Sequence, residues 1–352
     1  MEMRKLGRTD IDVSKICLGT MTWGQQNSEE DGHAQIEMAL DYGVNFLDTA
    51  EMYSVPARAE TYGSTETIIG SWLKKSGKRK DVVIATKIAG PAPHLNYIRP
   101  HLGGDKGNNL DRRSVIEACD ASLRRLGTDY IDLYQLHWPS RSTNYFGVLR
   151  YRPAKEDNYV SLEETLSAMK ELVDAGKVRA VGLSNETAWG AMHALKLSET
   201  IGLPRVASVQ NPYNFLNRSY EIGLAELADK ENCGLLAYSP LASGYLTGKY
   251  CGGVVPENSR FGLFGSTFGR YLNSPGTAAM ERYVALACDN GWDPAQMANT
   301  FVNMQPFVTS NIIGATNLTQ LKTALDTHDM TLPKELIKGI NEIETEYPMP
   351  CP

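Results

Sequence analysis

The strongest constraint on the fold is a short apolar run followed by an amphipathic helical pattern, repeated along nearly the whole sequence. Several of these runs are continuously apolar, which is typical of parallel strands buried on both faces. The predicted strands are Ile16–Leu18, Asn45–Asp48, Val82–Lys87, Ile131–His137, Ala180–Ser184, Ala207–Gln210, Gly234–Tyr238 and Ser310–Gly314. Strands that alternate with helices predict an α/β fold, either a closed (β/α)8 TIM barrel or an open doubly wound sheet.

Helical patterns with recognisable ends lie between these strands. Ser or Asp before an apolar stripe predicts where a helix begins, and glycine predicts where it ends. The predicted helices run from Ser28 to Gly43, from Asp111 to Gly127, from Ser161 to Gly176 and from Asn217 to Asn232.

Two observations favour the barrel over the open sheet. The alternation continues without a break in composition, and the sequence contains no G-x-G-x-x-G motif, the usual dinucleotide fingerprint of the open sheet. We therefore expect one barrel domain that spans residues 1–352. Residues 4–13 read as a β-hairpin with a polar turn, which would cap the bottom of the barrel.

Long insertions follow some of the strands and point to the location of the site. They span about Ser54–Thr65, Ala89–Leu110, Trp138–Tyr159 and Ser243–Pro275. Because each follows a strand, all would lie on the C-terminal face of a barrel, where the active sites of such folds are built. A deep, partly covered pocket is expected there.

Composition excludes several classes of function. The net charge is −6 with no basic stripe, so no nucleic-acid partner is expected. No apolar stretch approaches the length of a membrane span, and the N-terminus has no secretory pattern. The six cysteines are scattered without C-x-x-C, and the six histidines lack metal-ligand spacing. These features predict a cytoplasmic protein without a metal site, and they carry no signal for its oligomeric state.

Polar, aromatic or glycine residues stand at the ends of successive predicted strands. They are Asp48, Lys87, His137, Ser184, Asn185, Gln210, Tyr238 and Gly314. Taken singly, each is more often a structural or solvated side chain. Barrel closure would bring all of these strand ends together, so their joint placement predicts a functional site.

The motifs around these positions resemble the aldo-keto reductase superfamily. Asp48-Thr-Ala-Glu-Met-Tyr53 resembles its signature of a strand ending in Asp-Thr-Ala and followed by a Tyr. Thr86-Lys87 and Gln135-Leu-His137 match its Lys and His positions, and residues 176–185 match a further signature. Residues 238–250 resemble the branch that includes Tas-type reductases and potassium-channel β subunits. The resemblance extends over essentially the whole chain.

This resemblance implies that the chain reduces an aldehyde or ketone with hydride from NADP(H), and that Asp48, Tyr53, Lys87 and His137 are catalytic. Tyr53 would be the general acid, although a free Tyr has a pKa of about 10. We expect Lys87 to lower that pKa, Asp48 to hold Lys87, and a neutral His137 to orient the substrate oxygen.

The resemblance also implies a cofactor site. An aromatic platform at Tyr238 would stack on the nicotinamide, and Arg260 would meet a 2′-phosphate, which favours NADP over NAD. The complete expected set is Thr20, Met21, Trp23, Ser184, Asn185, Gln210, Tyr238, Ser239, Pro240, Leu241, Gly244, Lys249, Arg260, Gly314, Thr316 and Gln320. Close relatives often carry an acidic residue and an Asn on the adenine side, where this chain has Thr323 and Ala324.

The substrate pocket is expected to be walled by side chains at strand ends and in the long insertions. These are Trp23, Met52, Trp138 and Tyr145. Arg141, Arg150 and Arg152 would either meet an anionic substrate or be solvated. From Ser54 onward the chain departs from the family, in which a Gly often follows the Tyr, so we expect this segment to reshape the substrate rim.

Two other functions remain open at this stage. A nicotinamide-binding, redox-sensing regulatory subunit would use the same cofactor residues with little turnover. A Schiff-base aldolase would use Lys87 as its nucleophile, but would have no use for the residues that match cofactor contacts.

Overall fold

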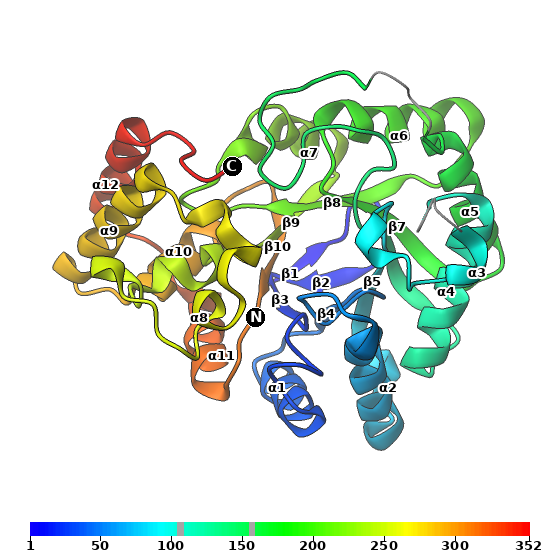
Figure 1. Ribbon diagram of the computed structural model, residues 1–352, viewed down its shortest axis with the longest axis horizontal. Helices are drawn as coiled ribbons and strands as arrows, with labels where there is room; N and C mark the ends of the chain where they lie inside the picture. Colours follow the sequence, from blue (N-terminus) through cyan, green and yellow to red (C-terminus); the bar gives the residue numbers. More distant parts are fainter. Residues whose placement is uncertain (104–108, 155–158) are drawn as a thin grey trace.

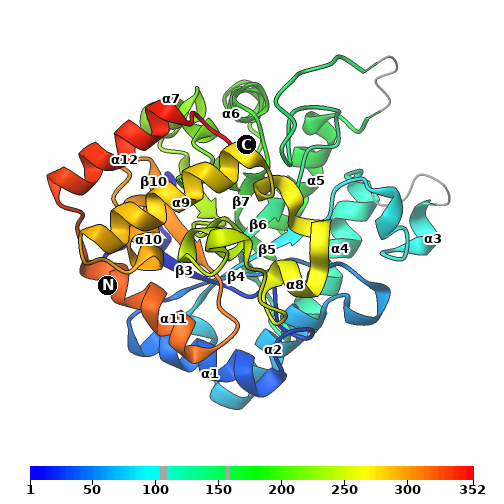
Figure 2. The same ribbon diagram turned by 60° about the vertical axis from the view of Figure 1, so that its left-hand side comes forward.

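The computed structural model describes residues 1–103, 109–154 and 159–352. Parallel strands close into an eight-stranded barrel in the order β10-β3-β4-β5-β6-β7-β8-β9, and the helices surround it (Figures 1 and 2). The barrel strands are β3 (Ile16–Gly19), β4 (Phe46–Asp48), β5 (Val83–Ile88), β6 (Ile131–Leu136), β7 (Val178–Ser184), β8 (Val206–Pro212), β9 (Gly234–Tyr238) and β10 (Val308–Ile313). The predicted (β/α)8 barrel is confirmed, and the open sheet is excluded.

Helices follow the barrel strands and continue into the C-terminal region. The α-helices are α1 (Glu29–Asp41), α2 (Ser64–Ser76), α3 (Pro100–Gly103), α4 (Arg112–Leu126), α5 (Leu162–Asp174), α6 (Ala188–Ile201), α7 (Leu224–Glu231), α8 (Arg260–Phe264), α9 (Ser274–Asp289), α10 (Pro294–Asn303), α11 (Leu318–Leu325) and α12 (Lys334–Glu346). Short 3-10 helices are η1 (Ala59–Thr61), η2 (Arg79–Asp81), η3 (Pro93–Leu95), η5 (Ser219–Glu221), η6 (Ala242–Thr247), η7 (Cys251–Gly253), η8 (Gly265–Tyr271) and η9 (Asp326–Asp329).

The predicted helix boundaries hold where capping side chains are present. Ser28 forms a capping box with Asp31, and Asp111 and Ser161 each accept a hydrogen bond from the first turn of their helix. The prediction of a helix over 217–232 is wrong in its first half. Asn217 Oδ1 accepts from the backbone of Ser219, which makes a local turn, and α7 begins only at Leu224.

The predicted N-terminal hairpin is confirmed and closes one end of the barrel. Strands β1 (Met3–Lys5) and β2 (Asp12–Ser14) pair antiparallel. Buried Leu6, Ile11 and Val13 of the hairpin pack in one cluster with residues inside the barrel, among them Phe46 and Leu133. At Gly7, with φ +59°, a Cβ atom would lie 2.5 Å from the carbonyl oxygen of Ala207. The hairpin therefore lies directly against the barrel strands.

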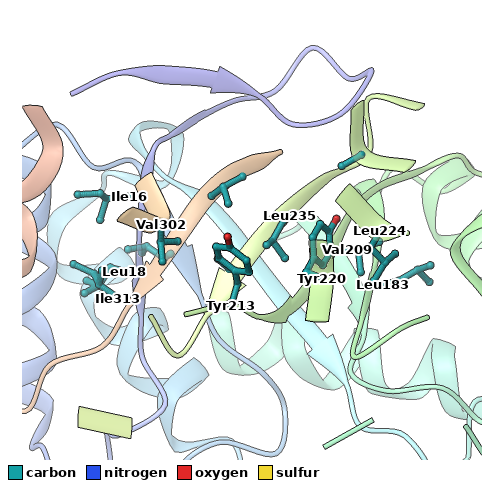
Figure 3. Packing of buried hydrophobic residues seen from close by; sticks show 14 of the residues in the cluster. Ile16, Leu18, Leu183, Val209, Tyr213, Tyr220, Leu224, Leu235, Val302 and Ile313 are labelled. Carbon is teal, nitrogen blue, oxygen red and sulfur yellow. The ribbon is translucent and has the colours of Figure 1, made fainter. Parts of the chain in front are cut away.

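The main apolar core lies between the outside of the barrel and the helices. Ile16 and Leu18 belong to this core, whereas Cys17 between them belongs to the cluster inside the barrel. Figure 3 shows part of the outer core, where Val209 and Leu235 of neighbouring strands lie beside Tyr220. Alternate residues of a strand face opposite sides, so a strand covered on both sides must be apolar throughout.

The predicted insertions all follow strands, and the described parts lie at the C-terminal end of the barrel. Residues 104–108 and 155–158 of two insertions lie outside the described residues. The insertion after β9 carries α8 and η8, and Figure 2 shows α8 in front of part of the barrel. Within the described ranges, no helix is both long and apolar enough to span a membrane. All six cysteines are free thiols.

Candidate active site

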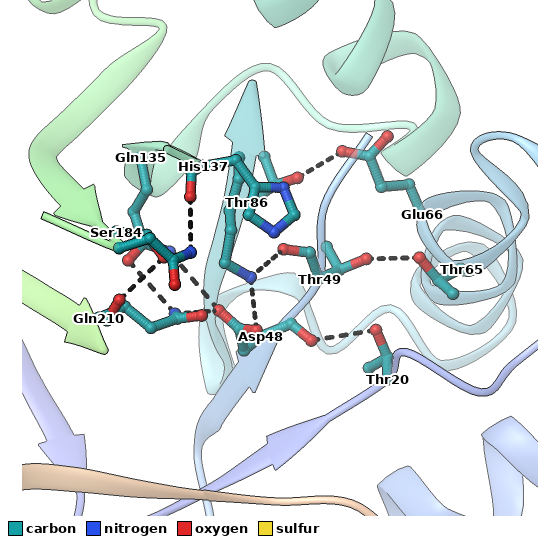
Figure 4. Close-up of polar contacts among 12 residues, drawn as sticks. Thr20, Asp48, Thr49, Thr65, Glu66, Thr86, Gln135, His137, Ser184 and Gln210 are labelled. Atoms are coloured by element: carbon teal, nitrogen blue, oxygen red, sulfur yellow. Dashed lines mark hydrogen bonds and ion pairs between the residues drawn. The ribbon is translucent and has the colours of Figure 1, made fainter. Parts of the chain in front are cut away.

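Asp48 and Lys87 form a buried ion pair at the C-terminal end of neighbouring strands. Asp48 is the last residue of β4, and Lys87 lies in β5 with no exposed surface. The Lys87 Nζ donates to Asp48 Oδ2 at 2.6 Å and to the carbonyl oxygen of Thr49 at 2.8 Å (Figure 4). A buried ammonium group needs such partners to remain charged, and this arrangement fixes its position.

Tyr53 and His137 lie on the open side of this ion pair. Lys87 Nζ is 5.0 Å from the centre of the Tyr53 ring. The rings of Tyr53 and His137 meet edge to face, with their centres 5.6 Å apart. The segment before Tyr53 is tied to β5, because the backbone N–H groups of Thr49 and Glu51 donate to the carbonyl oxygens of Ala85 and Lys87. The structure therefore brings the four predicted catalytic side chains together.

The protonation states follow from burial and from the neighbouring charges. Burial alone would lower the pKa of Lys87, but the charge and hydrogen bond of Asp48, together with Tyr53 and Cys17, raise that pKa overall. Burial, helped by Lys87, holds the pKa of His137 well below its usual value, so the ring is neutral at pH 7. Among the described residues, His137 Nδ1 has no hydrogen-bond partner.

The expected lowering of the Tyr53 pKa is wrong as a net effect. Burial, and after it the negative charge of Asp48, raises the pKa of the Tyr53 hydroxyl, and Lys87 and Arg260 oppose that rise only in part. The physical reason is that removing a phenolate from water costs more than these cations return. Tyr53 therefore keeps its proton at neutral pH.

A second polar network joins the ends of β7, β8 and β9. Ser184 Oγ donates to the carbonyl oxygen of Gln210 at 2.9 Å, and Asn185 Nδ2 donates to that of His137 at 2.9 Å. The Tyr238 hydroxyl donates to Asn185 Oδ1 at 2.6 Å. Gln210 Nε2 donates to Asp48 Oδ1 at 2.8 Å, which connects this network to the ion pair. These residues share one site with Asp48 and His137.

The residues after β9 form a tight turn with two cations beside it. Pro240 and Leu241 lead from Ser239 into η6, and Gly244 has φ +86°. Glycine is favoured here because L side chains rarely adopt this φ, and a Cβ atom on Gly244 would also lie 2.9 Å from Lys249 Nζ. The pKa of Lys249 is lowered by burial and by the positive charge of Arg260, the first residue of α8. Two cations that repel one another make this place suitable for an anion.

The remaining predicted cofactor residues follow β10 and β3. After Gly314, the backbone N–H and hydroxyl of Thr316 both contact Gln320 Oε1 at 3.1 Å. The Thr20 hydroxyl donates to the carbonyl oxygen of Asp48 at 3.0 Å, and the Met21 carbonyl accepts from the backbone of Val55. Each segment thus lies at a strand end on the C-terminal side of the barrel.

Three of the four predicted pocket walls lie in one cluster with Tyr53. Met52, Trp138 and Tyr145 pack there together with the apolar residues of the insertion after β5. Trp23 does not, because its ring is fully buried in the main core and Nε1 donates to Gln35 of α1 at 3.1 Å. This placement gives the Trp23 ring a packing role instead of the pocket wall that the sequence indicated.

Two residues near the site, Gln135 and Phe146, were not predicted to belong to it. Gln135 Nε2 lies 3.5 Å from Asp48 Oδ1, and Phe146 extends the aromatic contacts of Trp138 with ring centres 5.9 Å apart. The sequence did carry a signal for Gln135, because this polar residue lies within the buried strand β6. Arg141 makes two hydrogen bonds to Glu186 and stacks on Trp189, so its charge is already paired. Arg150 and Arg152 are exposed.

The comparisons with known proteins agree with this geometry. The model of the aldo/keto reductase family matches residues 15–345. The chain is 46% identical to Protein tas of Escherichia coli (strain K12) over 353 residues, which cover 100% of both chains. It is 30% identical to the uncharacterized oxidoreductase YrpG of Bacillus subtilis over 97% of this chain and 96% of the relative. It is 31% identical to a probable voltage-gated potassium channel subunit beta of Arabidopsis thaliana, over 94% of this chain and 92% of the relative.

Proposed function

Because the chain belongs to the aldo/keto reductase family of oxidoreductases, we propose that it reduces an aldehyde or ketone to the alcohol with NADP(H) as cofactor. The observation that carries this proposal is the arrangement of Tyr53 beside the buried Asp48–Lys87 ion pair and a neutral His137. A carbonyl reduction needs a proton donor that is protonated at neutral pH, and Tyr53 meets that condition.

The side chains would share the proton chemistry as follows. Tyr53 gives its hydroxyl proton to the substrate oxygen as that oxygen gains charge. The Lys87 ammonium, held by Asp48 and Thr49, stabilises the phenolate that remains. The neutral His137 ring orients the carbonyl oxygen through a hydrogen bond, and its Nδ1 atom has no partner among the described residues. The nicotinamide supplies the hydride.

The residues at the site fit such a cofactor. Lys249 and Arg260 would hold phosphate groups, and a Cβ atom at Gly244 would crowd the Lys249 ammonium group. Tyr238 would offer its ring to the nicotinamide, and Ser184, Asn185 and Gln210 would contact the carboxamide. A cationic guanidinium at Arg260 suits a 2′-phosphate, which supports NADP over NAD.

An uncharged, apolar carbonyl compound fits the pocket best. The cluster around Tyr53 contains Met52, Trp138 and Tyr145, and the Arg141 charge is paired with Glu186. Small-molecule pockets are commonly lined by such apolar and aromatic groups with a few polar residues for orientation.

A redox-sensing regulatory subunit is the second candidate. The 31% identity to a probable potassium channel subunit beta favours it. A broad panel of aldehydes and ketones separates the two functions, because the regulatory subunit would bind NADPH but oxidise it with none of them.

The proposal is tested by Tyr53→Phe and Arg260→Ala. Tyr53→Phe should remove about 10²- to 10⁴-fold of turnover, the usual contribution of a positioned acid, and leave NADPH binding nearly intact. Wild-type turnover in this variant would disprove the mechanism. Arg260→Ala should raise the Kd for NADPH much more than that for NADH. Equal effects would disprove the 2′-phosphate assignment.

A further inference from the structure

Two fully buried carboxylates lie next to the proposed catalytic pair but take no part in the chemistry above. Glu51 precedes Tyr53 by two residues, and Glu66 lies in the first turn of α2. A buried carboxylate is costly unless it is paired and hydrogen-bonded. The partners of these two side chains therefore show what holds this part of the site.

Glu51 joins separate segments of the chain. Its Oε2 atom forms an ion pair with Arg99, from the insertion after β5, and accepts from the Tyr62 hydroxyl at 3.3 Å. Its Oε1 atom accepts from the backbone N–H of Ala89 at 2.7 Å. Its own backbone N–H donates to the carbonyl oxygen of Lys87. Glu51 thus ties the Tyr53 segment to the strand that carries Lys87 and to the following insertion.

Glu66 continues these contacts to the other side. Arg125 donates to Glu66 Oε2 at 2.6 Å, and its guanidinium lies 4.9 Å from the centre of the Tyr62 ring. The Thr86 hydroxyl donates to Glu66 Oε1 (Figure 4). A continuous line of polar contacts therefore runs from Arg99 to Thr86. It includes Glu51, which stands two residues before Tyr53, and it ends at Thr86, the residue before Lys87.

Arg99 is the member of this line that comes from the substrate side. Its side chain is largely buried, and its backbone has φ +52°, a conformation that non-glycine residues rarely adopt. Leu95 and Ile98 of the same segment pack in the apolar cluster with Tyr53 and Trp138. The insertion is thus joined to the Tyr53 loop by an ion pair as well as by apolar packing.

We propose that Arg99 is a positioning residue which, through Glu51, holds Tyr53 in register with Lys87 for proton transfer. A buried ion pair is weak evidence for stability, because an apolar pair of similar volume is often as stable. Its directional hydrogen bonds do fix geometry, and a small displacement of a reacting group costs up to about 100-fold in rate. This inference rests on the proposed role of Tyr53 as proton donor.

The test compares Arg99→Met, Glu51→Gln and the double variant. Each single variant breaks the buried ion pair between Arg99 and Glu51 and should lower the thermal midpoint. The double variant removes both charges of the pair and should recover that midpoint. If the pair positions Tyr53, kcat should be about 10- to 100-fold below the wild-type value in both single variants and in the double variant. The Kd for NADPH should remain unchanged. Arg99→Lys, which keeps the charge, should restore part of kcat. Recovery of wild-type kcat together with the midpoint in the double variant would mean that the pair is only structural, and would overturn the proposal.

A matched control is a buried pair of the same kind at the other end of the barrel. Arg79 Nη2 donates to the buried Asp132 at 2.8 Å. Arg79→Met should lower the thermal midpoint and leave kcat unchanged. A similar loss of kcat in this variant would attribute the Arg99 effect to general destabilisation and would also overturn the proposal.

A readout without turnover separates this inference from the proposed function. In protein containing 3-fluorotyrosine, the ¹⁹F signal of Tyr53 is assigned by its loss in Tyr53→Phe. Its chemical shift and titration midpoint should change in the double variant and remain as in wild type in Arg79→Met. If no carbonyl compound is reduced, the proposed function fails while this measurement still decides the inference. An unchanged Tyr53 signal in the double variant would overturn it.

Discussion

The two ends of the barrel bury charge in different ways. At the N-terminal end, Asp132 accepts hydrogen bonds from Arg79, Arg179 and the backbone N–H of Ile84, so its oxygens are held by neighbours. At the C-terminal end, the Asp48–Lys87 ion pair lies beside Tyr53 and His137. The pKa of Tyr53 is raised and that of His137 is lowered. A fully bonded network stabilises the fold, whereas incompletely bonded groups are available to a ligand.

The two ends also differ in the length of the chain segments that connect strands and helices there. A short hairpin closes the N-terminal end, while the long insertions all belong to the C-terminal end. Stability and chemistry are therefore assigned to opposite ends of one barrel, as is general for this architecture. Substitutions at each end test this division.

The largest effect is expected from removing both charges of the C-terminal pair. In Asp48→Asn with Lys87→Met, the proposed proton donor Tyr53 loses its charged neighbour, so kcat should fall about 10²- to 10⁴-fold. The free energy of unfolding should change by less than about 2 kcal/mol, because replacing both partners of a buried pair is often neutral. Steady-state kinetics and urea unfolding measure the two quantities. A loss of about 4 kcal/mol or more would show that this end is also required for stability.

A smaller effect is expected at the N-terminal end. Gly7→Ala should cost about 2–4 kcal/mol of unfolding free energy, because a strained φ adds to a clash with the Ala207 carbonyl. Gly77, with φ +69° and no atom within 4 Å of a Cβ, is the matched control, and Gly77→Ala should cost about 1 kcal/mol. Neither variant should change kcat. Equal losses at the two glycines would mean that the hairpin does not press on the barrel.

The barrel and its strand ends could be predicted because they follow from local patterns. Continuous apolar runs that alternate with helical patterns are typical of strands covered on both faces. Polar residues at their ends, such as Asp48 and Lys87, converge once the barrel closes. The helix that begins late at Leu224 escaped because Asn217 bonds its own neighbours, an alternative that helical periodicity does not reveal.

The parts of the site that could not be predicted depend on packing between distant segments. The pKa of Tyr53 is raised by burial in a cluster that includes residues of the insertions, and by Asp48, and these effects outweigh the charge of Lys87. Arg99 meets Glu51 across 48 residues of sequence. Glu51 stands within the family signature, but nothing in the sequence predicts that Arg99 is its partner. The Trp23 ring packs in the main core and donates to Gln35 of α1. The sequence does not indicate whether this ring packs in the main core or in the cluster around Tyr53.

The smallest effect is a dependence of stability on pH that arises at the C-terminal end. His137 has a pKa near 6.5 in the unfolded chain, whereas burial beside Lys87 keeps it neutral in the folded chain well below that pH. The unfolded state alone gains a proton as the pH falls from 6.5 to 5.5, so stability is lost over this window, by about 1 kcal/mol. Carboxylates with lowered pKa, such as Glu37, start from 4.5 and lose their contribution below this window. Urea unfolding of wild type and His137→Gln at both pH values measures the difference. If the same loss of stability between pH 6.5 and 5.5 persists in His137→Gln, it arises from another group. The difference between the two ends of the barrel would then be supported by the kinetic measurements alone.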